Sequence, residues 1–188
     1  MSCFNSRPEL EHRCQDLVNI FAECFERSHN TILVAGAEEP LYQVADLECS
    51  KNRIHFTLDY YASGLHEIAH WLVAGEERRR LEDYGYWYAP DGRSAEQQAE
   101  FEKVEAKPQA LECILSRAAA FPFRVSADNA EAGLLPSEEF CQAIFCQLQC
   151  YCAGALNERS QKLIEALSRF YGTEGADQIA NYRREDVR

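Results

Sequence analysis

The spacing of hydrophobic positions predicts a chain that is mainly helical. In five stretches apolar side chains recur every three or four residues, which places them on one face of a helix. These stretches cover approximately residues 7–28, 64–75, 94–118, 137–155 and 158–171. Three begin at residues suited to cap a helix: Ser6 and Ser94 open capping-box patterns, and Asn157 precedes the last stretch.

Two shorter segments have the pattern of strands. Residues 31–35 form a β-branched run that Gly36 ends, and residues 53–59 alternate apolar with polar positions. In the second segment Ile54, Phe56 and Leu58 share the face expected to be buried. We therefore predict an α+β fold: a single, mainly helical domain over residues 1–188 with a small sheet.

The helix expected after Ser94 contains a proline at position 108. A proline inside a helix costs about 3 kcal/mol, because it removes one hydrogen bond and its ring crowds the preceding turn. We expect a kink there, and a kink aimed at a functional site is one explanation for such a residue. Glu105 borders the apolar stripe at the same point and is expected to need a partner.

Residues 66–70 carry the sequence His-Glu-x-x-His within the second helical stretch. On a helix His66 and His70 lie one turn apart on the same face and can bind one metal ion together. Glu67, on the same turn, is the candidate catalytic residue. We expect this helix to pack against the long proline-containing helix.

Two histidines need a third protein ligand for a mononuclear metal site. Glu105 is the first candidate, and Glu112, two turns further along, is the second. The alternative for Glu105 is a surface ion pair with Lys103 or Lys107. His12 and His29 are expected to be surface residues rather than ligands.

The net charge of −12 argues against nucleic acid or an anionic membrane surface as partner and suits a cationic substrate, although many proteins are acidic only for solubility. No apolar run approaches the roughly 20 residues of a membrane helix. The N-terminus has no secretion signal pattern, which favours a cytoplasmic protein. The nine cysteines are then expected to be thiols, and those of residues 141–152 to be buried as small apolar side chains.

Residues 83–92 form the most aromatic stretch of the chain. Its side chains suit a core as well as a substrate-binding wall that could hold a lysine-type cation. The candidates for substrate binding are Tyr84, Tyr86, Trp87 and Tyr88.

The residue types leave three functions open. In a zinc hydrolase, Glu67 would act as general base on metal-bound water. In an iron(II) oxygenase, two histidines and one carboxylate would hold the metal and leave positions open for dioxygen. A helical adaptor with a structural metal, or with none, is the non-enzymatic alternative.

A resemblance separates these alternatives. The segments HEIAHW at 66–71, DYGYWY at 83–88 with PDGR at 90–93, and VEAKPQALE at 104–112 resemble the signature of the bacterial elongation factor P hydroxylase family. The three motifs occur in order, and the similarity extends over most of the chain.

That resemblance implies hydroxylation of the lysine of translation elongation factor P that already carries a β-lysyl group. It also implies a metal centre built from His66, His70 and a glutamate, which we place at Glu105 because the matching motif contains it. Carbon hydroxylation needs activated oxygen, which redox-inert zinc cannot supply, so we expect iron(II) with dioxygen as cosubstrate. A purified sample could carry another divalent ion. Neither direct contact with nucleic acid nor a membrane is expected.

Overall fold

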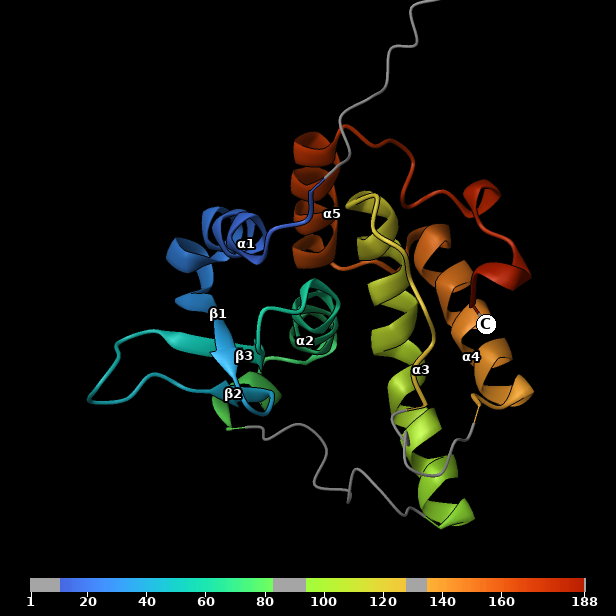
Figure 1. Ribbon diagram of the computed structural model, residues 1–188, viewed down its shortest axis with the longest axis horizontal. Coiled ribbons are helices and arrows are strands. Elements are labelled where there is room, and N and C mark those ends of the chain that lie inside the picture. Colours follow the sequence, from blue (N-terminus) through green and yellow to red (C-terminus); the bar gives the residue numbers. More distant parts are fainter. Residues whose placement is uncertain (1–10, 83–93, 128–134, 188) are drawn as a thin grey trace, which may run out of the picture.

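The protein, described here from a computed structural model, is mainly helical and has one small sheet (Figure 1). The structure describes residues 11–82, 94–127 and 135–187. Its five longer helices are α1 (Cys14–His29), α2 (Tyr61–Val73), α3 (Ala95–Ala118), α4 (Glu138–Cys150) and α5 (Glu158–Tyr171). Short helical segments are η1 (Arg78–Arg80), η2 (Tyr151–Ala155), η3 (Ile179–Asn181) and η4 (Arg184–Val187). This architecture confirms the α+β class; that one domain spans all of 1–188 stays a prediction.

The sheet has three strands in the order β1-β3-β2. The central strand β3 (Asn52–Thr57) pairs in parallel with β1 (Thr31–Ala37) and antiparallel with β2 (Leu41–Gln43). The two strands expected from the sequence are present, and β2 was missed because three residues are too short to show an alternating pattern.

Helix α2 is the centre of the fold. It contacts β3 on one side and α3 on the other, while α1 packs on β1 and α4 and α5 pack against α3 (Figure 1). The shared core includes large, fully buried side chains from α1, β3, α2 and α3, among them Phe21, Phe56, Leu65 and Ile114. The sequence of α2 is mostly apolar for this reason: two of its faces are covered.

Gly64 allows α2 to approach α1 and β3 closely. A Cβ atom at this position would lie 2.8 Å from Cδ2 of Leu17 and 3.5 Å from the ring of Phe56, both of which are fully buried. Because neither neighbour can move into solvent, a larger residue would push α2 away from the sheet.

The C-terminal end of α2 is fixed by side chains from α5 and the turn before it. Arg159 donates hydrogen bonds to the carbonyl oxygens of Trp71, Leu72 and Ala74 at 2.9–3.1 Å. Asn157, which also caps α5 as expected, donates to the carbonyl of Leu72 at 2.9 Å. These donors satisfy carbonyl groups that have no partner within the helix, and the guanidinium complements the negative end of the helix dipole.

Helix α3 begins as predicted and continues through its proline. Ser94 and Gln97 form the complete capping box, and residues 95–118 stay helical with Pro108 inside. Pro108 is buried, whereas Val104, whose carbonyl loses its helical donor, is 43% exposed. The spacing predicted that Val104 belongs to the buried stripe of this helix, and its exposure shows that this prediction is wrong.

Three predictions near element ends differ from what the described residues show. Ser6 and Arg7, where the sequence placed the start of the first helix, lie outside the described residues; within them the helix begins only at Cys14, since Arg13 is extended. His12, expected at the surface, is half-buried. Its ring packs against Tyr61, Phe121 and Tyr171, and its Nε2 lies 2.8 Å from the carbonyl oxygen of Ala119. Leu58 follows the end of β3 in a left-handed conformation (φ 48°) and is 50% exposed instead of buried.

The cysteines of residues 141–152 are less buried than expected. Cys141 is buried, but Cys146 and Cys150 are exposed and Cys152 is intermediate. The eight cysteines within the described residues are all free thiols.

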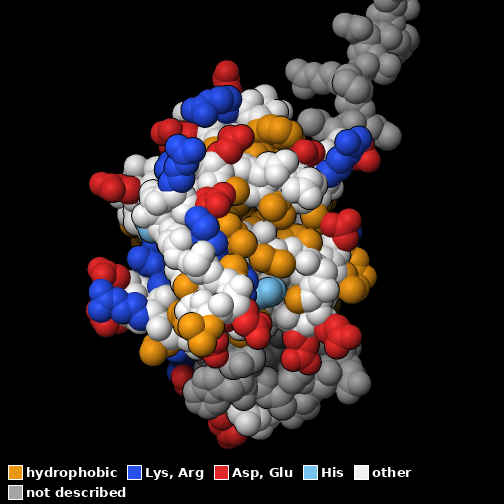
Figure 2. Space-filling model, turned by 90° about the vertical axis from the view of Figure 1, so that its left-hand side faces the viewer, with side chains coloured by type: hydrophobic (Ala, Val, Ile, Leu, Met, Phe, Trp, Pro, Cys, Tyr) orange, Lys and Arg blue, Asp and Glu red, His pale blue; other side chains and the backbone are white. Residues whose placement is uncertain are grey.

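The described surface does not gather its charge into one block on the face shown in Figure 2. There, acidic and basic side chains are mixed at the left and top, acidic ones lie at the lower right, and hydrophobic ones lie toward the middle. Within the same described ranges, no helix is long and apolar enough to cross a membrane.

Replacing Leu65 by alanine tests the central position of α2. Leu65 is fully buried, so Leu65→Ala should lower the free energy of unfolding by about 2 to 5 kcal/mol, through lost burial and a residual cavity. Leu47→Ala is the matched control: Leu47 is fully exposed, and its truncation should change stability by less than about 0.5 kcal/mol. Urea unfolding followed by circular dichroism measures both, and equal losses would contradict the packing described.

Candidate metal centre

The two histidines of α2 lie next to each other on one face of that helix. Their ring centroids are 4.6 Å apart, and Nε2 of His66 lies 3.0 Å from Nε2 of His70. Both side chains are about a quarter exposed, so the pair is accessible from one side. The i, i+4 spacing therefore does bring two imidazole nitrogens to one point.

Glu105 reaches the same point from α3. Its Oε1 lies 3.2 Å from Nε2 of His70, and its Oε2 lies 3.7 Å from Nε2 of His66. The side chain is only 1% exposed, which excludes the surface ion pair considered from the sequence. Among the described residues, His66, His70 and Glu105 form a group whose possible ligand atoms all lie within 4.8 Å of one another.

Glu112, the second candidate, occupies a different position. Its Oε2 lies 2.8 Å from Nδ1 of His66, the ring nitrogen that faces away from His70 and Glu105. Glu112 is nearly buried, with 9% of its surface exposed. The structure thus places both glutamates near His66, on opposite nitrogens of its ring.

Gln109 lies between these glutamates on α3 and was not singled out by the sequence. It donates to Oε2 of Glu105 at 3.3 Å, and its amide makes two hydrogen bonds with the backbone of Ser126, at 2.8 and 3.0 Å. The one signal in the sequence that could have pointed to Gln109 is its position four residues after Glu105, on the same face of the helix. Gln109 ties the Glu105 carboxylate to the extended segment that follows α3.

The electrostatics of the site are dominated by carboxylates packed around imidazoles. Burial by itself would lower the pKa of His66, but Glu112, Glu105 and Glu67 together raise it to about 10. Burial would raise the pKa of Glu105, but His70 and His66 lower it to about 2. Burial raises the pKa of Glu67, and Glu105 and Glu112 add to this effect. Negative charge therefore accumulates here and favours a positive charge between the donor atoms.

The donor set fits a divalent cation. Oε1 of Glu105 is buried and has no hydrogen bond of good geometry, although it lies within ion-pair distance of His70. The two Nε2 atoms lie 3.0 Å apart, so in the tautomers protonated at Nδ1 both lone pairs can face one ion. Two histidines and one carboxylate on adjoining helices can hold a metal and leave further coordination positions open.

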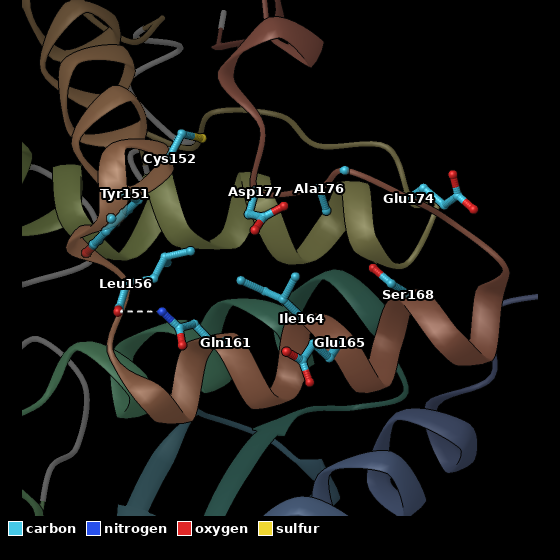
Figure 3. A pocket seen from close by; sticks show the side chains of 12 residues that line it. Tyr151, Cys152, Leu156, Gln161, Ile164, Glu165, Ser168, Glu174, Ala176 and Asp177 are labelled. Atoms are coloured by element: carbon cyan, nitrogen blue, oxygen red, sulfur yellow. Dashed lines mark hydrogen bonds between the residues drawn. The ribbon is translucent and has the colours of Figure 1, made fainter.

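The aromatic residues predicted to bind substrate, Tyr84, Tyr86, Trp87 and Tyr88, lie outside the described residues. A groove of about 420 Å³ is present elsewhere, between η2, α5 and residues 174–177 (Figure 3). Ile164, Glu165 and Asp177 line it, and none of the residues of the metal-ligand group does. The groove is therefore separate from the candidate centre.

Comparisons with known proteins place the chain in a family. Residues 20–182 match the family described as elongation factor P hydroxylase. The chain is also 50% identical over 173 residues to the elongation factor P lysine hydroxylase of Haemophilus influenzae, a match that covers 92% of this chain and 97% of that protein. The family match over residues 20–182 spans α2 and α3 completely and thus includes both histidines and both glutamates. The chain belongs to the elongation factor P hydroxylase family.

Proposed function

We propose that this protein hydroxylates the lysine of translation elongation factor P that carries a β-lysyl group, in a metal-dependent reaction with dioxygen. The observation that carries the proposal is the convergence of His66, His70 and Glu105 in a member of this family. The substrate follows from the name of the relative in Haemophilus influenzae and from the resemblance of the three motifs. Because the proposed substrate is a translation factor, we also propose that the enzyme acts in the cytoplasm.

Iron(II) is the metal we propose for the site. Iron bound by two histidines and one carboxylate can activate dioxygen, which carbon hydroxylation requires and zinc does not provide. The residues of the chain would do the remaining work. His66, His70 and Glu105 would hold the ion, with Gln109 orienting the Glu105 carboxylate.

The charge of the site suits the proposed substrate. A β-lysyl-lysine arm is long and cationic, and Glu67, Glu105 and Glu112 lie within electrostatic reach of the two histidines. A divalent ion would neutralise two of these negative charges, so one remains to attract an ammonium group. Glu67, next to His66 in sequence and not part of the three-residue group, is the residue we propose to face the substrate arm.

The position of Glu67 is also compatible with a second function, that of a zinc peptidase. In a zinc peptidase the glutamate between the two histidines is the general base, and the donor set here is compatible with zinc. The two functions differ in their product, because a peptidase cuts the chain of its substrate and a hydroxylase leaves it whole.

The mass of the product distinguishes a hydroxylase from a peptidase. Incubation of β-lysylated elongation factor P with the iron-loaded enzyme, dioxygen and a two-electron reductant should add the mass of one oxygen atom to the factor and leave its chain intact, with the second oxygen atom released as water. His66→Ala, His70→Ala and Glu105→Ala should abolish this addition, because each removes a proposed ligand. Intact-mass spectrometry reads out oxygen addition and backbone cleavage in one measurement.

Glu100→Gln is the matched control for these variants. Glu100 lies on the same helix as Glu105 but pairs with Lys103 at the surface, so its loss should leave activity unchanged. Cleavage fragments in place of the heavier factor would support the peptidase. Full activity of Glu105→Ala would show that the third ligand lies elsewhere.

Metal binding can be measured in the absence of substrate through its effect on stability. Co(II) or anaerobic Fe(II) at about 100 times its dissociation constant should stabilise the wild-type protein by about 2.7 kcal/mol, because the ion binds only the folded state. For a chain of this size the melting temperature should rise by roughly 5 to 10 °C. Differential scanning calorimetry measures the shift. His66→Ala and His70→Ala should lose it, and a wild-type protein that shows no shift would argue against a metal enzyme.

A further inference from the structure

The ring of His66 is held from both sides, and only one side faces the proposed metal. Its Nε2 points to the space shared with Nε2 of His70 and the carboxylate of Glu105. Its Nδ1 lies 2.8 Å from Oε2 of Glu112. A carboxylate accepts hydrogen bonds and cannot donate them when ionised, so Nδ1 must carry the proton in this contact.

Glu112 is a buried carboxylate in an apolar part of α3. It is 91% buried on α3, seven residues after Glu105 and therefore on a similar face of the helix. Its neighbours Leu111, Cys113 and Ile114 are apolar core residues. A buried carboxylate is costly unless it is paired, and its one hydrogen-bond partner within the described part of the chain is His66.

We propose that Glu112 is a positioning residue for the metal centre: through Nδ1 it fixes the orientation and the tautomer of His66, so that the lone pair of Nε2 faces the ion. This role rests on the proposed metal function of His66, His70 and Glu105. Metal-bound histidines commonly donate their second ring N–H to a carboxylate or carbonyl, which raises the basicity of the ligating nitrogen. Glu112 would also keep the His66 ring from rotating toward the open side of the site.

The position of Glu112 separates this role from direct ligation. Its carboxylate meets the nitrogen of His66 opposite to the one that faces His70, and it is not part of the group whose donor atoms lie within 4.8 Å of one another. A residue on that side can reach the ion only through the imidazole. Its loss should therefore weaken and distort metal binding without abolishing it.

The test is a titration of the full-length metal-free protein with Co(II), followed by the visible absorption of the bound ion. We expect Glu112→Ala to weaken Co(II) binding by about 10- to 100-fold and to shift the absorption bands, because His66 loses its fixed orientation. Glu112→Gln keeps an acceptor oxygen and the volume of the side chain, so its loss should be smaller. Glu100→Gln should match the wild type in both affinity and spectrum.

Three results would overturn the proposal. Co(II) affinity of Glu112→Ala and Glu112→Gln within about twofold of the wild type, with unchanged bands, would show that His66 does not depend on Glu112. Complete loss of binding in folded Glu112→Gln, as expected for His66→Ala, would make Glu112 a ligand itself. A wild-type protein that binds no Co(II) would overturn this role together with the proposed function, whereas the first two results leave that function standing. Should Glu112→Ala fail to fold, Glu112→Gln decides by the same criteria.

Discussion

The packing of α2 against α3 is the interaction on which the candidate centre depends. His66 and His70 come from one helix and Glu105 and Glu112 from the other, and the two pairs meet only because the helices touch along this face. Neither helix could form the site alone. Every feature that fixes the distance between α2 and α3 therefore also fixes the distances between the donor atoms.

Several independent contacts hold α2 in place. Gly64 lets the helix approach the buried Leu17 and Phe56, and the apolar side chains on two of its faces fill the space between sheet and α3. At the other end, Arg159 and Asn157 bind the last carbonyl groups. Burial and the nearby Arg79 lower the pKa of Arg159 to about 10, which still leaves it charged at neutral pH. His70 lies in the final turn of α2, so these contacts act directly next to a proposed ligand.

The site concentrates three carboxylates beside two imidazoles in a largely buried place. Such an arrangement is unfavourable unless positive charge balances it. The neighbouring carboxylates raise the pKa of His66, and His70 and His66 lower the pKa of Glu105, so a proton on the imidazoles offsets part of the negative charge. The same charges make the place suitable for a divalent ion and, once the ion is bound, for a cationic substrate. A single electrostatic constraint thus links the metal and the substrate proposed for this family member.

The sequence determined the local features of this protein. Periodic apolar positions located the five helices and two strands, the capping residues Ser94 and Asn157 marked helix starts, and the i, i+4 spacing placed two histidines on one face. These features depend on neighbours within a few residues, and such interactions can be read along the chain. For Glu105, which borders an apolar stripe beside Pro108, the sequence left a buried ligand and a surface ion pair open, and only the structure shows its burial.

Only the tertiary structure decided which groups from distant segments meet. Glu105 and Glu112 were alternatives for one role, but the packing of α3 on α2 brings both to His66, on different ring nitrogens. The contacts of Gln109 with Ser126 and the packing of His12 among aromatic rings were not predicted for the same reason. Their positions depend on contacts across many residues, and a helical period specifies a face without specifying what that face will touch.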